Sequence, residues 1–248
     1  MYLCGVLLTH NFISMKKVLV SAFAALCAFG AFAQVSFWDS EAAAKKLFFT
    51  PRVGLNVSKL SFDIPDGDVE GKKAKIGFNV GVGVDYMINR SFGINTGLFY
   101  TTKGVKFEEK DEDYKDTQTY NAGYLQLPVY ASYRLNFAED SQLQVNFGPY
   151  FAYGINGKVT DKYVDYEDPD YSEEYKYDLF GTSDDDKDRA GIKRFDLGLG
   201  VGVGYTFKRV HLGLEYQFGL LNCLEKDEWG SDYKAYTRNL SISVGYTF

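Results

Sequence analysis

Residues 194–207 read RFDLGLGVGVGYTF, and every second position is apolar. The apolar positions are Phe195, Leu197, Leu199, Val201, Val203, Tyr205 and Phe207, and between them stand Asp196, Gly198, Gly200, Gly202 and Gly204. A period of two predicts a β-strand with one apolar face. In a soluble sandwich the second face meets water and is rich in charged residues, Ser and Thr. Small residues mixed with a charge instead suit the interior of a narrow closed barrel, and the apolar face suits lipid.

The same alternation recurs in seven more runs. They are residues 48–57, 75–87, 91–104, 123–135, 142–155, 210–220 and 237–248. Tilted strands of about 9–11 residues span a bilayer, and each of these runs is long enough. Pro128 and Pro149 lie inside two of the runs, where proline is disfavoured, so we expect a bulge or a missing ladder bond at each.

The connections between the runs alternate in length. Long connections (58–74, 105–122, 156–193 and 221–236) alternate with short ones (88–90, 136–141 and 208–209). Short turns on the periplasmic side and long loops outside are typical of transmembrane barrels. The sequence therefore predicts an all-β fold, an eight-stranded antiparallel transmembrane β-barrel over residues 48–248.

Aromatic residues cluster at the ends of the runs. Those expected near the periplasmic ends are Phe49, Tyr86, Phe92, Tyr133, Tyr205, Phe207, Tyr246 and Phe248, and those near the outer ends are Phe78, Tyr100, Tyr153 and Phe195. Two such belts mark the two membrane interfaces. A general strand preference of Phe and Tyr explains their number but not this clustering.

Composition excludes several classes of protein. The chain has 248 residues, 17% aromatic residues and a formal charge of −6. Disordered chains are poor in aromatics, and a pI near 5.1 disfavours nucleic-acid binding. A mean hydropathy of −0.24, with no apolar run of about 18 residues, disfavours a helical membrane protein.

The N-terminal region is interpreted as an export signal. Residues 15–33 combine two lysines, an apolar stretch and an Ala-Phe-Ala cleavage site, as secretory signal peptides do. Residues 1–14 then precede the true start, and 34–47 form a short periplasmic segment. A lipoprotein signal is weaker, because Leu26 stands before Cys27 where a small residue is expected. Cleavage leaves Cys223 as the one cysteine, so the mature chain has no internal disulfide.

The runs resemble a known family, the small outer-membrane β-barrel proteins of Bacteroidota labelled "porin family" or PorT-type. The resemblance rests on RVGLNVSKL (52–60), GLFYTTKGVKF (97–107), YLQLPVYASYRL (124–135), NFGPYFAYGI (146–155), FDLGLGVGVGYTF (195–207), LGLEYQFGLLN (212–222) and the terminal SISVGYTF. It implies a Gram-negative outer-membrane location and no particular activity. The terminal Phe248, with Tyr246 two residues before it, resembles the signal read by the barrel-assembly machinery.

One group of residues has the types that hydrolytic chemistry needs. His211 and Glu215 lie on one face of the same run, and Ser241 or Ser243 in the next run would complete a Ser-His-Glu set. A satisfied polar network inside the barrel is the stronger interpretation, because His211 lies close to the periplasmic end. We therefore predict no enzyme activity and assign no catalytic, cofactor-binding or metal-binding residue.

Charged residues on the interior face are expected to pair across the lumen, because a buried unpaired charge is costly. The bases are Arg52, Lys75, Lys103, Arg134 and Arg194, and the acids are Asp85, Asp196 and Glu215. Eight strands leave room for side chains or one small ligand, not for an aqueous channel.

The long connections carry most of the negative charge. Residues 59–74, 107–118, 157–192 and 222–236 hold 26 acidic and 12 basic residues. The first interpretation of these acidic, Tyr-rich loops is that they are simply solvated. The alternatives are that they bind Ca²⁺, bridge lipopolysaccharide phosphates through divalent ions, or contact an extracellular partner. Asp184, Asp186 and Asp188 mimic the start of a calcium loop, but Arg189 and Phe195 replace its Gly and Glu, so it is not an EF-hand.

We expect a non-enzymatic barrel with a structural or surface-interaction role. The alternatives are a narrow-lumen transporter or binder of small or lipidic molecules, and an accessory subunit of a secretion or envelope-assembly machine. The expected partners are outer-membrane lipid and lipopolysaccharide, the barrel-assembly machinery and an extracellular partner, and not nucleic acid.

Overall fold

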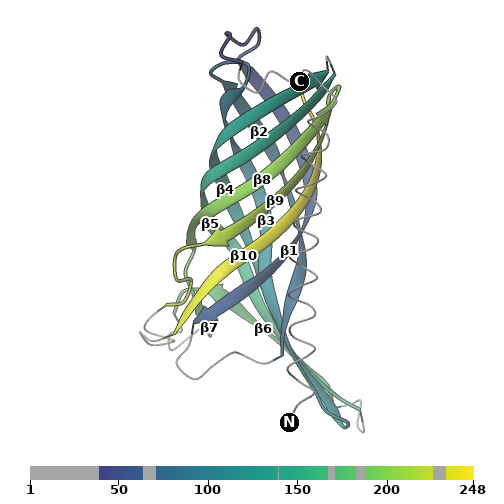
Figure 1. The fold of residues 1–248 in the computed structure, drawn as a ribbon. Helices are drawn as coiled ribbons and strands as arrows, with labels where there is room; N and C mark the ends of the chain where they lie inside the picture. Colours follow the sequence, from purple (N-terminus) through teal and green to yellow (C-terminus); the bar gives the residue numbers. More distant parts are fainter. Residues whose placement is uncertain (1–38, 64–70, 139, 167–170, 183–187, 226–232) are drawn as a thin grey trace, which may run out of the picture. The chain divides into compact units, whose positions relative to one another are not determined.

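The computed structural model describes residues 39–63, 71–138, 140–166, 171–182, 188–225 and 233–248, which lie in one compact unit. Ten strands make up this unit (Figure 1): β1 (Leu47–Asp63), β2 (Lys72–Met87), β3 (Phe92–Lys110), β4 (Tyr114–Ala138), β5 (Ser141–Asp165), β6 (Glu173–Phe180), β7 (Arg189–Ile192), β8 (Phe195–Phe207), β9 (Val210–Gly219) and β10 (Lys234–Tyr246). None of the described residues forms a helix long and apolar enough to cross a membrane. The predicted signal peptide, residues 15–33, lies outside the described residues.

Eight of the strands close into a ring. Pairing runs β1-β2-β3-β4-β5-β8-β9-β10, and β10 pairs with β1 along twelve residue pairs from Arg52↔Gly245 to Asp63↔Lys234. Every pairing in the ring is antiparallel. β6 and β7 continue the sheet from the far end of β5 and are parallel to each other. The prediction of an eight-stranded antiparallel barrel is confirmed, and each predicted run is one strand of the ring.

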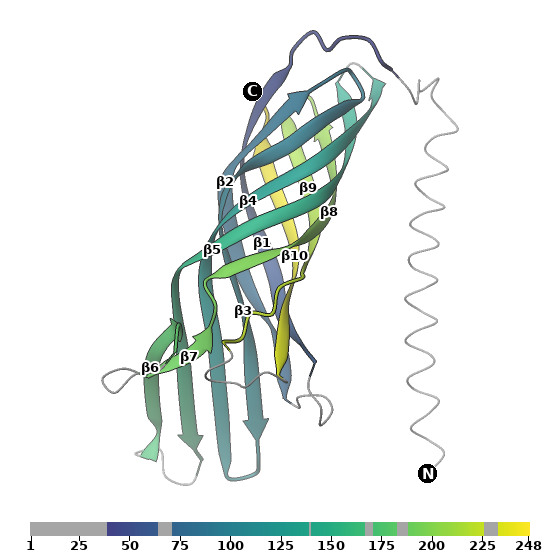
Figure 2. The same cartoon turned by 90° about the vertical axis from the view of Figure 1, so that its left-hand side faces the viewer.

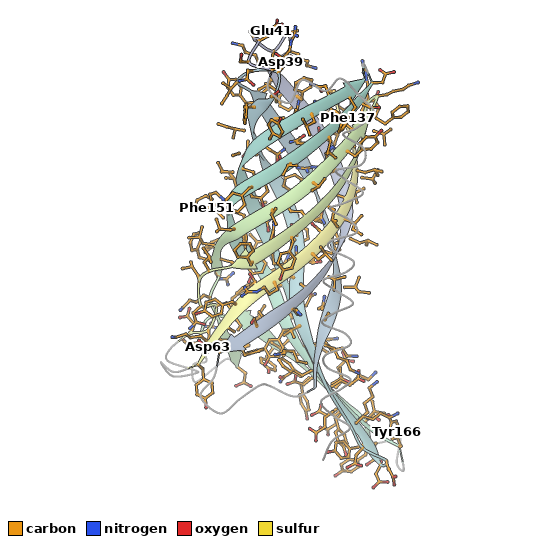
Figure 3. All side chains as sticks on the ribbon, viewed as in Figure 1. Asp39, Glu41, Asp63, Phe137, Phe151 and Tyr166 are labelled. Carbon is orange, nitrogen blue, oxygen red and sulfur yellow. The ribbon has the colours of Figure 1, made fainter. Side chains whose placement is uncertain are left out.

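The two faces of the wall are arranged inside out relative to a soluble protein. Outward side chains in the wall are apolar and exposed, as Leu55 (66% exposed), Ile76 (72%) and Ile242 (63%) illustrate. Inward side chains include many buried polar residues, among them Asn56 and Asn239. Figure 3 shows Phe151 directed away from the wall. An apolar exterior around a polar interior is the pattern of a transmembrane barrel.

The glycines of β8 make room for two tyrosines inside the barrel. A Cβ atom at Gly200 would lie 2.3 Å from the hydroxyl of Tyr130, and one at Gly198 would lie 2.6 Å from the ring of Tyr150. Both tyrosines are at most 1% exposed. The glycine row is therefore one side of a packed interior, and the tyrosines of β4 and β5 are the other.

Both prolines interrupt the ladder without shifting its register. Between β3 and β4 the pairs stop at Thr96↔Val129 and resume at Phe99↔Gln126, which leaves Pro128 unpaired with β3. The carbonyl of Pro128 accepts a hydrogen bond from the Thr96 hydroxyl at 2.7 Å. Pairing between β4 and β5 likewise has a gap opposite Pro149. The prediction of a missing ladder bond at each proline is confirmed.

Aromatic residues form two belts, one at each end of the wall. We call the end with the short connections the turn end and the opposite end the loop end. Phe92 contacts Tyr133 at the turn end, with ring centroids 5.1 Å apart, and Phe78 contacts Tyr100 near the loop end at 5.8 Å. Tyr153 and Phe195 are paired residues that continue the loop-end belt on β5 and β8. The spacing between the belts marks the part of the wall that faces lipid.

The predicted long loops are largely strand, which is a correction. Residues 105–122 lie in β3 and β4 except for the turn at 111–113, and residues 156–193 contain the end of β5 together with β6 and β7. Figure 2 shows β3, β4, β5 and β6 running on past the other strands. We call this part of the sheet, residues 105–122, 157–165 and 173–180, the extension. Parts of the predicted loops (64–70, 167–170, 183–187 and 226–232) lie outside the described residues.

An apolar cap closes the loop end of the lumen. It consists of the buried side chains Leu179, Phe180, Ile192, Cys223 and Leu224. Phe180 meets the inward ring of Tyr124 edge-on at 5.8 Å, and a Cβ atom at Gly154 would collide with it. The cap therefore lies on the inner side of the wall, where it excludes water from that end of the lumen.

Closure of the ring can be tested by cross-linking. Leu55 and Ile242 are outward-facing partners on β1 and β10. With the three native cysteines changed to Ala, Leu55→Cys/Ile242→Cys should react with a short bismaleimide and give a fast-migrating, looped chain on a denaturing gel. Leu55→Cys/Val145→Cys, whose partner lies across the ring on β5, should not. Equal cross-linking of the two variants would contradict the closed ring.

Candidate functional site

The barrel interior is the place where buried polar groups concentrate. At its loop end the Lys103 ammonium lies 3.1 Å from Asp196 Oδ2, and the two side chains are only 3% and 2% exposed. The same oxygen accepts hydrogen bonds from Tyr150 Oη (3.2 Å) and Thr237 Oγ1 (3.0 Å). Lys103 Nζ also lies 4.4 Å from the centroid of the Tyr150 ring. Several partners thus compensate each charge for the loss of water.

A second network surrounds Asp85 near the turn end. Arg134 Nη2 lies 3.2 Å from Asp85 Oδ2. Asn95 and Gln144 donate to the other carboxylate oxygen at 2.6 and 2.9 Å. The guanidinium of Arg134 also lies 5.0 Å from the centroid of the Phe48 ring. This network fills the lumen between the middle of the barrel and the turn end.

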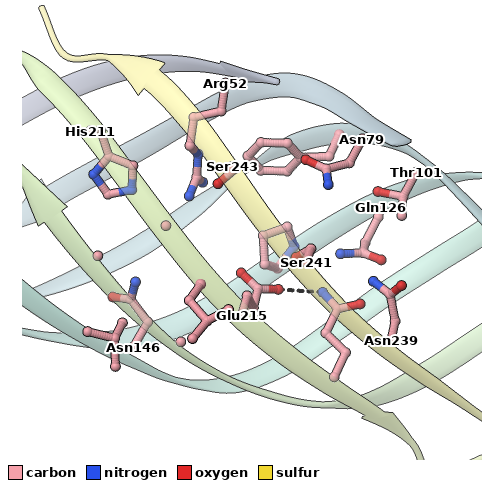
Figure 4. Close-up of a pocket in the computed structure, with 18 residues that line it drawn as sticks. Arg52, Asn79, Thr101, Gln126, Asn146, His211, Glu215, Asn239, Ser241 and Ser243 are labelled. Atoms are coloured by element: carbon pink, nitrogen blue, oxygen red, sulfur yellow. Dashed lines mark hydrogen bonds between the residues drawn. The ribbon is translucent and has the colours of Figure 1, made fainter. Parts of the chain in front are cut away.

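A cavity of about 40 Å³ lies between the two networks (Figure 4). Its lining includes Arg52, His211 and Glu215. It also includes three amide side chains whose buried oxygens have no hydrogen-bond partner among the described residues. Those amides are Gln126, Gln217 and Asn239. About 10–15 Å³ suffices for one water molecule, so the cavity has the size and polarity to hold a few waters or a very small polar ligand.

The candidate Ser-His-Glu residues share this cavity but do not form a relay. The described hydrogen bond of His211 joins its Nδ1 to Thr206 Oγ1 at 3.0 Å. Glu215 Oε1 instead accepts from the Tyr130 hydroxyl at 2.9 Å and from Gln217 Nε2. A catalytic relay needs the base bonded to its orienting acid. The described contacts therefore fit the polar-network interpretation.

The predicted pairing of interior charges is correct for two pairs and wrong for the rest. Lys103–Asp196 and Arg134–Asp85 form as expected. The bases that find other partners are Arg52 (4.7 Å from the Phe99 ring centroid), Lys75 (bonded to Asn121) and Arg194 (bonded to the Gly154 carbonyl). Glu215 is compensated by Tyr130 and Gln217 rather than by a base. At Glu215 two neutral donors take the place of a base. The three bases are met instead by an aromatic ring or by neutral acceptor oxygens.

Metal binding finds no support in the part of the chain that the structure describes, where no group of three or more His, Cys, Asp or Glu side chains could hold an ion. Asp184 and Asp186 of the calcium-like segment lie outside the described residues, so that segment is not tested. Sequence reasoning did not identify Tyr130, Tyr150 or Gln217 as interior residues of note. Their inward parity in the predicted strands was the available signal.

Residues 32–225 match a family described as outer membrane protein beta-barrel domain. No curated protein matches the chain. Among solved structures, it resembles Ail, the attachment invasion locus protein of Yersinia pestis (16% identity, 82% of this chain and 100% of that chain, TM-score 0.35), Neisserial surface protein A (15%, 82% and 100%, 0.35) and OprG from Pseudomonas aeruginosa (12%, 85% and 99%, 0.36).

The Lys103–Asp196 pair provides a stability test. Asp196→Leu should destabilise the barrel by about 3–5 kcal/mol, because it leaves the Lys103 ammonium buried without its carboxylate. Lys103→Met/Asp196→Leu should recover most of that loss, since neither charge remains and the hydroxyls of Tyr150 and Thr237 can bond each other at 3.1 Å. Urea unfolding in detergent, followed by the shift between folded and unfolded gel bands, measures both. A double variant as unstable as the single one would refute this account.

Proposed function

Because the chain belongs to the outer membrane protein beta-barrel domain family, we propose that it is a non-enzymatic barrel with a structural or surface-interaction role in a Gram-negative outer membrane. In this proposal a signal peptide at 15–33 directs export, and the C-terminal strand directs assembly. The loop end with its extension faces the outside of the cell. The narrower placement among PorT-type proteins of Bacteroidota is part of the proposal and rests on the quoted sequence motifs.

The observation that carries this function is the inner face of the extension. This is the face continuous with the lumen, as the burial of Val105 and Val159 indicates. One row of cross-strand partners on it runs Glu109↔Asp116↔Tyr163↔Glu173 over four strands. Glu109 stands directly opposite Asp116, and like charges in such positions destabilise a sheet. A surface that keeps two carboxylates opposite each other despite this cost is suited to binding a cationic partner, which would neutralise them.

Pairs of aromatic side chains flank the acidic row on both sides. Tyr114 stacks on Tyr163 with ring centroids 5.8 Å apart, and Phe107 packs edge-on against Tyr120 at 5.7 Å. The adjoining groove has a volume of about 590 Å³. Burial and the nearby carboxylate of Asp161 raise the pKa of Tyr177 to about 12, so this tyrosine stays neutral at physiological pH. Carboxylates among aromatic faces attract Lys and Arg by charge and by cation–π contact.

We therefore propose that the inner face of the extension binds an extracellular partner through an extended, Lys- or Arg-rich segment. The lumen has a secondary role in this proposal, because the apolar cap and two polar networks fill most of it. The narrow-lumen binder remains the second candidate function. It is favoured by the central cavity and its three amide oxygens.

A peptide titration tests the proposed partner chemistry. An extended peptide of alternating Lys and Thr should bind the purified protein in detergent, and binding should weaken as NaCl rises because exposed charges are screened. Glu109→Gln/Asp116→Asn/Glu173→Gln should weaken binding about tenfold or more. The matched control, Asp63→Asn/Glu174→Gln/Asp178→Asn, removes equal charge from the outward face and should bind like the native protein. An equal loss of peptide binding in both variants would mean that binding depends only on the net charge of the protein, and would overturn the proposal.

Bilayer conductance measurements distinguish the second candidate function, a narrow-lumen binder, from an open channel. With the lumen filled at its loop end, the reconstituted protein should show no stable large-conductance openings. Phe180→Ala, which removes the one aromatic ring among the five residues of the apolar cap, is the variant in which leakage should first appear. Stable large openings of the native protein would contradict the closed lumen.

A further inference from the structure

The outward face of the extension and the adjoining wall is basic, although the segments that form it are acidic as a whole. Two like-charged pairs stand directly opposite each other on neighbouring strands: Lys59 with Arg238, and Lys73 with Lys106. A third pair, Lys110 and Lys115, follows nearer the tip. Lys59, Lys73 and Lys110 are exposed. We call these six residues the basic band.

Like charges in directly opposed positions destabilise a sheet. One such pair is unremarkable on a protein surface, but three pairs on one face, over five strands, require a counter-charge. Asp63, Glu174 and Asp178 also lie on this outward face. Within the described residues, however, the acid ion-paired with the basic band is Glu108, which interacts with Lys73, Lys106 (2.8 Å) and Lys115 (3.6 Å). One carboxylate thus serves three ammonium groups, and two positive charges remain uncompensated at this point.

The geometry of that cluster leaves its positive charges accessible. The side chain of Glu108 is 13% exposed, whereas those of Lys73, Lys106 and Lys115 are 55%, 35% and 34% exposed. The carboxylate therefore lies beneath the lysines and holds their ammonium groups together at the surface. Hydrogen bonds from Lys106 and Lys73 lower the pKa of Glu108 to about 2, so it stays ionised and keeps the lysines in place. Grouped ammonium donors of this kind match the oxygens of a phosphate.

Two of the three pairs of the basic band, Lys59 with Arg238 and Lys73 with Lys106, lie just beyond the loop-end belt. Lys106 is six residues beyond Tyr100 of the loop-end belt on β3. Lys59 is four residues beyond Leu55 on β1, and Leu55 pairs with Phe78 of the same belt. At about 3.3 Å per residue and a tilt of about 40°, these positions are about 10–15 Å above the belt. Long lysine side chains can reach back from there towards the headgroups. On the side of the belt nearer the turn end, this outward face is the apolar wall that meets lipid.

We propose that the basic band binds phosphate groups on the headgroups of outer-leaflet lipids. This surface is the reverse of the one proposed to bind a cationic partner, so the extension has two faces of opposite charge and separate ligands. One face is turned to the lipid surface and the other to the lumen side. Lipid phosphates would supply the counter-charge that the three like-charged pairs lack, and would hold the extension upright on the membrane.

The test uses lipid A with two phosphates as the probe. The full-length mature protein in detergent is titrated with this lipid, and the bound fraction is measured by native mass spectrometry. Lys73→Gln/Lys106→Gln/Lys115→Gln should weaken binding about tenfold or more, since each lysine near an anionic lipid surface adds to the electrostatic attraction. Lys59→Gln/Arg238→Gln should also weaken it, through a different part of the band.

Two controls make the outcome decisive. Lys45→Gln/Lys46→Gln/Lys208→Gln removes three charges from the turn end and should leave lipid A binding unchanged, and dephosphorylated lipid A should bind all proteins weakly. Each variant must show the native shift between folded and unfolded gel bands. Equal binding by the Lys73/Lys106/Lys115 variant and the native protein would overturn the proposal. Displacement of lipid A by millimolar inorganic phosphate would also overturn it, because the band would then be a site for free phosphate.

Discussion

The closed ring of backbone hydrogen bonds is the constraint on which this structure depends. In a bilayer no water is present to satisfy an exposed strand edge, so a sheet can cross only if its first and last strands pair. Here β10 pairs with β1 over twelve residue pairs. Once the ring is closed, the alternation of side chains has one solution, with the apolar face towards lipid and the other face towards the lumen. The two proline gaps are tolerated because the register continues on both sides of each gap.

A narrow ring imposes a second condition, which is that the interior must be filled. Large polar side chains such as Tyr130 and Tyr150 enter from β4 and β5, and the glycines of β8 leave space for them. Burying polar groups is costly unless they are hydrogen-bonded, and most of these groups are joined in networks around Asp196, Asp85 and Glu215. The central cavity is where this filling is incomplete, so it is the part of the lumen with unused hydrogen-bonding capacity.

Beyond the membrane the same strands continue, and there the two faces acquire opposite charge. Inside the wall, alternation separates apolar from polar residues. In the extension it separates an acidic row on β3, β4 and β6 from lysines such as Lys73 and Lys106. The net negative charge of these segments is therefore an average over two surfaces that differ in sign. A single fold rule, the period of two along a strand, sets both the lipid-facing wall and the two proposed binding faces.

The sequence by itself determined the eight strands of the ring, their inward and outward faces and the two prolines at which pairing fails, because these depend only on local periodicity and on the missing N–H of proline. It also indicated that Lys103, Asp196, Arg134 and Asp85 would lie inside. It did not determine which interior groups meet, since Glu215 bonds to Tyr130 only through the curvature that brings β9 across from β4. Nor did it reveal the extension, because charged strands without an apolar face look like loops. Only the register between strands decided which charges stand opposite each other, since pairing depends on residues far apart in the chain.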